Sequence, residues 1–225
     1  GDPLTTPGAS VYIGAYDVPV PVPFVFTKSF DGPTAAGGTA ELTFKLENVG
    51  AAVGDLSFTD DLNVVLSGLV AVGLPKNDIC GTGSTLSGTS LITLTGGSLG
   101  VGETKEFSVT VQVPAGTPAG IYPNTTSDLL AAGLPAADPA TADLQIEPPP
   151  TFAKVFGPDT IYAGETTTLT FTIDNSDSAS AATNIDFTDN LPAGMVVANP
   201  ANVSTTCSSG IITAVPGSGT ITYTG

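Results

Sequence analysis

The residues in this sequence that could do chemistry are mainly carboxylates. The chain holds 21 Asp and Glu but no His, so it cannot build a catalytic triad or an imidazole general base. The sequence contains no Gly-rich phosphate loop of the Gly-x-x-x-x-Gly-Lys type. Asp60 and Asp61 are adjacent, so on a strand they would face opposite sides and could not act as an acid and base pair. These residues favour a protein that is not an enzyme.

Two groups of aspartates could bind calcium instead. Carboxylate and backbone carbonyl oxygens are the ligands that Ca²⁺ prefers, although the Asp-x-Asp-x-Asp-Gly loop of a dedicated calcium site is missing. The alternative is that these acids cap turns and face water. The residues concerned are Asp55, Asp60 and Asp61 in one group, and Asp174, Asp177, Asp186 and Asp189 in the other.

The charge balance restricts the partners of the chain. Five lysines are its only bases, and the formal net charge is −16. Recognition of nucleic-acid phosphates needs clusters of Lys and Arg, so we expect no nucleic-acid binding. No apolar run approaches the roughly 18 to 20 residues that cross a bilayer, so we expect no membrane insertion. Scarce bases, many Thr, Ser, Gly and Ala, and two glycan acceptor triplets at Asn124 and Asn202 predict an extracellular or cell-surface location.

An internal repeat decides the architecture. Phe26-Thr-Lys-Ser-Phe30 returns as Phe152-Ala-Lys-Val-Phe156, at an offset of 126 positions. Further along, Leu56-Ser-Phe-Thr-Asp-Asp-Leu62 returns as Ile185-Asp-Phe-Thr-Asp-Asn-Leu191, at an offset of 129. Small changes of offset are what loop insertions produce. The chain therefore consists of tandem units.

Within each repeat the apolar residues alternate with polar ones. Leu42, Phe44 and Leu46 alternate with Thr and charged residues, and Leu169, Phe171 and Ile173 do the same in the second repeat. A period of two predicts strands with one buried face. Further strands are expected at 91–94 and 107–113, with turns at Gly37-Gly38, Gly96-Gly97, Pro114-Ala-Gly116 and Pro192-Ala-Gly194.

Short strands at this spacing predict an all-β fold of tandem immunoglobulin-like β-sandwiches. We place the first repeat at 24–147, a Pro-rich linker at 148–150, and a second, incomplete repeat at 151–225. Residues 1–23 contain a strand-like piece, Ser10 to Tyr16, and are expected to be the end of a preceding unit. Whether 1–225 is a mature subunit or an excerpt of a longer array stays open.

These motifs resemble a known group of proteins. The pattern Phe-x-Lys-x-Phe, followed by Gly-Glu-Thr-Thr-Thr-Leu-Thr-Phe and Asp189-Asn-Leu-Pro-Ala-Gly194, resembles tandem repeats of uncharacterised function in large bacterial and some archaeal surface proteins. In the first repeat the Pro-x-Gly part of the motif is absent after Asp60. The resemblance implies immunoglobulin-like repeats at a cell surface and no known activity.

A second resemblance concerns Lys28, Asp60 and Asn124. Lys28 lies on the first expected strand, Asn124 near the last, and Asp60 between them. This order is similar to that in surface proteins of the collagen-adhesin type, and the similarity implies an isopeptide bond between Lys and Asn, with the acid shuttling protons in an apolar interior. The alternative is a surface Lys, a turn Asn and a capping Asp. The cross-link requires burial of all three.

The two cysteines occupy equivalent positions in successive repeats. A disulfide needs Cα atoms within about 7 Å, which a domain length exceeds, so we expect no bridge between Cys80 and Cys207. Cys80 is expected to be a buried free thiol, with an intermolecular link as the alternative.

The function predicted from these features is a structural repeat of a cell-surface or filament-forming protein. Its partners would be neighbouring repeats or further copies of the chain, with residues 1–23 of one copy completing 151–225 of the next, head to tail. The alternative is an adhesin module that binds glycan or protein, with calcium as a candidate ion. Without Trp and with five Tyr, the chain has few residues for stacking on sugars, which favours the structural function.

Overall fold

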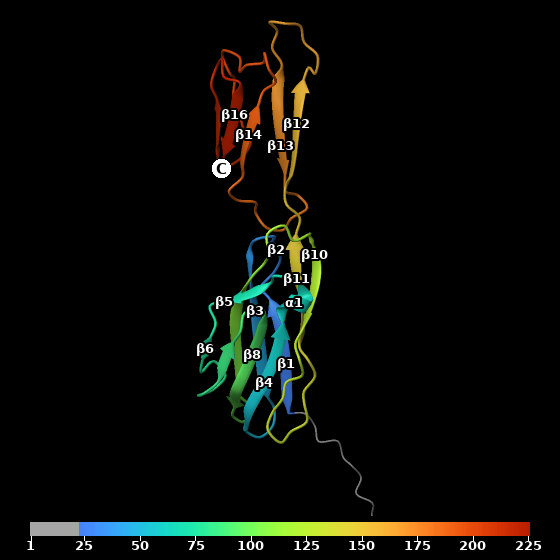
Figure 1. Cartoon of the computed structure of the whole chain (residues 1–225), viewed down its shortest axis with the longest axis vertical. Helices are drawn as coiled ribbons and strands as arrows, with labels where there is room; N and C mark the ends of the chain where they lie inside the picture. Colours follow the sequence, from blue (N-terminus) through green and yellow to red (C-terminus); the bar gives the residue numbers. More distant parts are fainter. Residues whose placement is uncertain (1–22) are drawn as a thin grey trace, which may run out of the picture.

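The structure, a computed structural model, describes residues 23–225 as two β units that follow one another along the long axis of the molecule (Figure 1). The first unit contains β1 (Phe24–Phe30), β2 (Thr34–Ala35), β3 (Thr39–Asn48), β4 (Val53–Asp61), α1 (Leu62–Val65), β5 (Val70–Val72), β6 (Lys76–Asn77), β7 (Thr85–Ser87), β8 (Leu91–Leu99), β9 (Thr104–Gln112), β10 (Gly120–Thr125) and β11 (Thr141–Glu147). The second contains β12 (Thr151–Gly157), β13 (Thr168–Asp174), β14 (Asp186–Asn190), β15 (Ile211–Ala214) and β16 (Thr220–Thr224).

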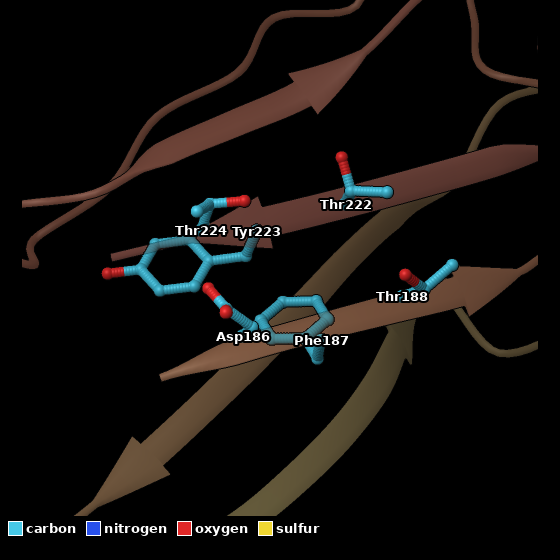
Figure 2. A pocket seen from close by; sticks show the side chains of 6 residues that line it. All are labelled: Asp186, Phe187, Thr188, Thr222, Tyr223 and Thr224. Atoms are coloured by element: carbon cyan, nitrogen blue, oxygen red, sulfur yellow. The ribbon is translucent and has the colours of Figure 1, made fainter. Parts of the chain in front are cut away.

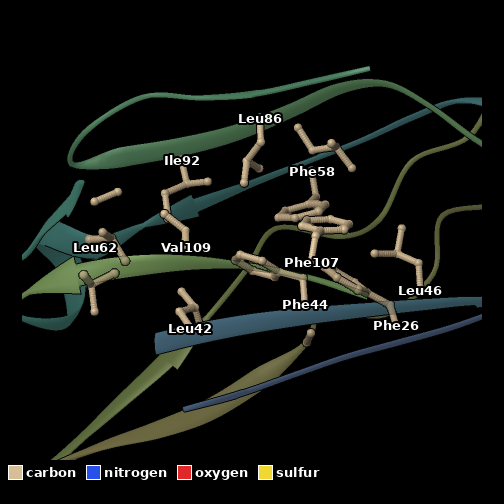
Figure 3. Close-up of a cluster of buried hydrophobic side chains, with 14 of the residues drawn as sticks. Phe26, Leu42, Phe44, Leu46, Phe58, Leu62, Leu86, Ile92, Phe107 and Val109 are labelled. Carbon is tan, nitrogen blue, oxygen red and sulfur yellow. The ribbon is translucent and has the colours of Figure 1, made fainter. Parts of the chain in front are cut away.

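Two four-stranded sheets form the first unit, in the orders β1-β3-β9-β5 and β4-β8-β7-β6. Their inner faces meet at a dry core (Figure 3). Phe44 of β3 is fully buried, and its ring centroid lies 4.9 Å from that of Phe58 on β4. Burial of one such side chain contributes about 1.5–3 kcal/mol. The alternating residues therefore join two sheets, and the predicted all-β sandwich is confirmed.

A third sheet, in the order β10-β11-β2, completes the first unit. The chain after β10 then runs along the outer edge of β4, where Thr126 bridges Asp60 and Leu130 bridges Ser57. The Ser127 amide donates to the carbonyl of Thr59 at 2.7 Å. This edge segment, residues 126–130, covers an edge that would otherwise expose unpaired backbone groups.

One predicted turn is wrong. Gly96 and Gly97 lie inside β8, which extends to Leu99 rather than ending at Leu94. Opposite β4 the register slips, because Leu56 faces Gly97 while Phe58 faces Leu94, which leaves one extra residue on β8. Gly96 takes a φ of +66°. A β-bulge with glycine in the left-handed region has this form, so the Gly-Gly pair bends the strand instead of ending it.

The second unit repeats the first with fewer strands. It has the ladders β12-β13 and β14-β16-β15, which correspond by repeat offset to β1-β3 and β4-β8-β7. Within residues 151–225 nothing corresponds to β9, β10 or β11. The counterpart of β5 is also not a strand, because β5 pairs with β9 alone. The inward residues Phe171 and Phe187 are consequently half-buried, whereas Phe44 and Phe58 are enclosed.

A buried glutamate joins the two units. Glu147, the last residue of β11, accepts hydrogen bonds from the Ser178 hydroxyl at 2.7 Å and from the amides of Ala179 and Ser180 at 2.7 and 3.1 Å. These bonds lower the pKa of Glu147, the Ser178 hydroxyl contributing most. A carboxylate held by several donors favours one arrangement of the linker.

The expected strand from Ser10 to Tyr16 and the remainder of 1–22 lie outside the described residues. Across residues 23–225, helices long and apolar enough to cross a membrane are lacking.

Candidate functional site

Lys28, Asp60 and Asn124 meet inside the first unit. The Lys28 Nζ lies 3.1 Å from Oδ2 of Asp60, and the Asn124 Nδ2 donates to the same oxygen at 3.2 Å. The three residues come from β1, β4 and β10, three strands that are distant in sequence. A shared acceptor places the lysine amine and the asparagine carboxamide side by side.

The period of the strands directs Lys28 and Asp60 inward, and Asn124 is the one buried position of β10. Lys28 follows Phe26 at the next inward position of β1, and Asp60 follows Phe58 in the same way on β4. Their direct neighbours across the ladders are Phe44 and Ile92. Polar side chains thus occupy positions that would normally hold core residues.

Burial at the site is nearly complete. Lys28 is 7% exposed, Asp60 0% and Asn124 1%. Desolvation raises the pKa of Asp60 and lowers the pKa of Lys28, while the attraction between the two groups opposes both shifts. Both shifts bring the pKa of the amine and the pKa of the acid closer together, which makes transfer of the proton from Lys28 to Asp60 easier.

Two acceptors at this site have no hydrogen-bond partner among the described residues. They are Oδ1 of Asp60 and Oδ1 of Asn124. A buried polar atom without a partner costs about 1–3 kcal/mol, so a purely structural cluster would be expected to satisfy them. Rotation of the amide by half a turn would place Oδ1 of Asn124 on a protonated Asp60, since the O and N of an amide are assigned from such networks.

The second unit contains the same lysine and aspartate without the asparagine. Lys154 on β12 lies 2.6 Å from Oδ1 of Asp189 on β14, and their side chains are 31% and 15% exposed. The corresponding values for Lys28 and Asp60 are both 0%. Oδ2 of Asp189 is buried and has no partner among the described residues. We did not predict this pair from the sequence, although Lys154 and Asp189 lie at the repeat offsets of Lys28 and Asp60.

The other predicted acidic sites are not assembled. Asp61 accepts from the Asn63 amide at the start of α1, Asp174 accepts from the Ser176 amide, and Asp60 and Asp189 pair with lysines. Asp55, Asp177 and Asp186 are exposed. Within residues 23–225 no three acidic, His or Cys side chains converge as metal ligands. The aspartates of both proposed calcium groups therefore act singly, as caps, ion-pair partners or solvated residues.

The two predicted glycan acceptors differ in exposure. Asn202 is exposed, whereas Asn124 is enclosed by the first unit. Its carboxamide is hydrogen-bonded to Asp60, so the prediction of a glycan at Asn124 is wrong for the folded chain.

Cys80 and Cys207 are not bridged to each other, and Cys80 is the buried free thiol that we expected. Cys80 is buried, and desolvation raises the pKa of its thiol. Cys207 is exposed, and a hydrogen bond from the Tyr223 side chain lowers its pKa.

A shallow groove of about 480 Å³ lies over β14 and β16 (Figure 2). Its lining consists of Asp186, Phe187, Thr188, Thr222, Tyr223 and Thr224. Neither Lys154 nor Asp189 belongs to this lining. The groove marks the incompletely covered second unit.

Comparisons with known proteins give one family. The model of the family described as "Domain of unknown function (DUF7933)" matches residues 23–146 and again residues 150–225. The comparison with curated proteins finds no match.

Several solved structures are weakly similar. A family 123 glycoside hydrolase from Clostridium perfringens has a TM-score of 0.35 and 8% identity, over 56% of this chain and 27% of that chain. BslA, a bacterial hydrophobin, has a TM-score of 0.32 and 11% identity, over 55% and 92%. A CARDB domain from Pyrococcus furiosus has a TM-score of 0.29 and 15% identity, over 55% and 88%. Similarities at this level carry no argument about function.

Proposed function

This chain belongs to the DUF7933 family of domains of unknown function, and we propose that it is a structural repeat of an extracellular protein whose first unit is locked by an isopeptide bond between Lys28 and Asn124. The observation that carries the proposal is the shared hydrogen bonding of Lys28 and Asn124 to Asp60 in a buried core.

The bond would form in one step of acyl transfer. The neutral Nζ of Lys28 attacks Cγ of Asn124, a new Cγ–Nζ amide bond forms, and the Cγ–Nδ2 bond breaks. Asp60 donates its proton toward the carboxamide oxygen as negative charge develops there, and returns a proton from Nζ to the leaving nitrogen. Ammonia is the only product lost, and no group is oxidised or reduced.

The apolar surroundings make this chemistry reasonable. A protonated lysine has no lone pair with which to attack, and burial lowers its pKa. A carboxylate cannot donate a proton, and burial raises the pKa of Asp60. The fold also holds amine and carboxamide together, which replaces a bimolecular encounter by an intramolecular reaction. Each chain reacts once, so we propose a self-modifying structural protein and not a turnover enzyme.

The position of the bond suits a tandem surface protein. It would join β1, the first strand of the unit, to β10, close to the last strand, so tension along an array would pass through a covalent bond. Acidic composition, scarce bases and the repeated family match support an extracellular array. Neighbouring repeats, or further copies joined head to tail, are the partners that this architecture would take.

Intact mass spectrometry of the purified chain tests the proposal. We expect a mass lower than that of the sequence by one ammonia, and the full sequence mass for Lys28→Ala and for Asn124→Ala. Lys45→Ala is the matched control, because Lys45 is exposed on β3, and it should keep the deficit. If the chain without substitutions carries the full sequence mass, the cross-link is refuted.

A further inference from the structure

The second unit holds two of the three residues of the same site, and we propose that it is an acceptor for a strand that brings the third. Lys154 and Asp189 would form an isopeptide bond with an asparagine on a β-strand that docks along β14. This inference rests on the cross-link proposed for the first unit and adds a second site with a defined partner strand.

The registers of the two units place the lysine and aspartate equivalently. Lys154 faces Phe171 across the β12-β13 ladder, as Lys28 faces Phe44. Asp189 faces Ile221 across the next ladder, as Asp60 faces Ile92. Phe187 precedes Asp189 on the inward face, and its ring centroid lies 4.8 Å from that of Phe171, close to the 4.9 Å between Phe58 and Phe44. The pair of phenylalanine rings beside the lysine and aspartate is therefore present in both units.

The two units differ in the third residue of the site, because no described residue of the second unit corresponds to Asn124. In the first unit one oxygen of Asp60 serves both Lys28 and Asn124. In the second unit Lys154 occupies Oδ1 of Asp189, and Oδ2 is buried without a partner in the described chain. An unsatisfied carboxylate oxygen at this depth is an acceptor for one more donor. A carboxamide is the donor that the first unit supplies at this point.

The backbone around the pair is also open. Among the described strands β14 pairs with β16 alone and β13 with β12 alone, so each has a free edge. In the first unit the corresponding edges are covered by residues 126–130 and by β9. Exposed edges beside half-buried aromatic residues are sites for strand addition.

The first unit defines the incoming strand. Thr126 bridges Asp60 in antiparallel register, and the reactive Asn124 precedes it by two positions. The occupant is therefore a strand of the type of residues 120–130, antiparallel to β14, with an asparagine two positions before the residue opposite Asp189. Residues 1–22 contain no asparagine, so as a donor strand they could add backbone pairing but not this bond.

Docking would create the conditions for reaction. The incoming strand covers Lys154 and Asp189 and places a carboxamide beside the amine, so that an intramolecular encounter replaces a bimolecular one. Nζ of Lys154 then attacks Cγ of the asparagine, the bond from Cγ to Nδ2 breaks, and ammonia leaves. The balance of atoms is the same as in the first unit.

A chain extended by its own first unit tests the inference. A second copy of residues 97–147 is added directly after Gly225. Gly225 corresponds to Gly96 of the first unit, because both pairs, Asp60 with Asp189 and Gly96 with Gly225, are 129 positions apart. The addition supplies a second copy of β9, β10 and β11 and a second copy of Asn124. We expect the mass to fall by one more ammonia than in the unextended chain. Lys154→Ala, or Asn→Ala in the added copy, should abolish only this second loss.

Two measurements separate the possible failures. Peptide mapping locates each cross-link, so a missing bond at Lys154 is distinguished from a missing bond at Lys28. Hydrogen exchange at β13 reports docking, because its free edge should become protected when the added strands pair with it. Protection without the second ammonia loss would overturn the covalent part of the inference. Unchanged exchange at β13 would overturn the acceptor function itself.

Discussion

The side chains of Lys28 and Asp60 form an ion pair, 3.1 Å long, in which neither side chain has any solvent exposure. Burying two charged groups costs several kcal/mol per ion before their attraction is counted, so such a pair contributes little stability by itself. The presence of this pair in the core is better explained by its reaction with Asn124. The Asn124 carboxamide donates a hydrogen bond to the same oxygen of Asp60.

Replacing Asp60 by Asn should prevent the cross-link while keeping the shape of the side chain. An amide cannot shuttle the proton that the acyl transfer requires, so the chain should show its full sequence mass. Loss of a link that closes a loop of roughly 100 residues should lower the free energy of unfolding by about 4–5 kcal/mol in urea titrations.

Asp61→Ala is the matched control for that change. Asp61 accepts from the Asn63 amide at the start of α1 and makes no hydrogen bond to Lys28, Asp60 or Asn124. We expect a cost of about 1 kcal/mol from the lost cap and an unchanged ammonia deficit. A deficit that disappears with Asp61 and persists without Asp60 would contradict the assignment of the acid.

The pH dependence of the uncross-linked chain, Asn124→Ala, follows from the two pKa shifts. The pKa of Asp60 is raised, so its contribution to stability is full below its unfolded pKa of about 3.9 and declines as pH rises through the folded value. The pKa of Lys28 is lowered, so its contribution is full above about 10.4 and declines as pH falls through the folded value. Near neutral pH both groups therefore oppose folding.

An apolar replacement of the pair should relieve this cost. In the Asn124→Ala background, Lys28→Met combined with Asp60→Leu is expected to be neutral or to stabilise by about 1–4 kcal/mol at pH 7. Lys28→Met alone should destabilise by about 3–5 kcal/mol, because Asp60 then loses its partner. A double variant as unstable as the single one would show that the ion pair itself stabilises the core.

The fold was largely predictable from the sequence, and the site only in part. The alternation of Leu42, Phe44 and Leu46 specified an inward face, and the repeat offset carried it to the second unit. Gly96 was misjudged because a glycine in the left-handed region serves a bulge as well as a turn.

Burial of the polar cluster needed the structure. A strand pattern places Lys28 and Asp60 on inward faces, but whether Asn124 joins them depends on the path of residues 120–130 across the sheet edge. The Lys154–Asp189 pair was accessible to repeat alignment alone. The strand that would dock beside this pair could not be inferred from the alignment, because an open sheet edge is a property of the assembled strands.

Acid should loosen the connection between the units. The hydrogen bonds from Ser178, Ala179 and Ser180 lower the pKa of Glu147, so its contribution is present above the unfolded pKa of about 4.3 and is lost as pH falls through the folded value. Small-angle scattering should show a broader range of shapes once the pH falls below the lowered pKa of Glu147. Glu147→Ala should give the same result at pH 7, whereas the exposed Glu106→Ala should not. Equal scattering for both variants would exclude a junction held by Glu147.

The second unit should open more readily than the first. Phe171 is half-buried and β13 has one paired edge, whereas Phe44 is fully buried and β3 is paired on both sides. Amide exchange at β13 is expected to be faster than at β3 by several orders of magnitude, since exchange follows local opening. Phe44→Ala should cost about 3–5 kcal/mol and Phe171→Ala less. Equal protection of the two strands would mean that the second unit is already complete.

Tryptic mapping of the chain without substitutions tests the central claim most directly. The five lysines divide the sequence into defined fragments, with cuts expected after Lys28, Lys45, Lys76, Lys105 and Lys154. A lysine whose Nζ is an amide is not cut, so we predict that residues 1–45 remain one fragment, covalently joined to 106–154, with the mass of one ammonia missing. Separate fragments 1–28 and 106–154, both with their full sequence masses, would contradict the account.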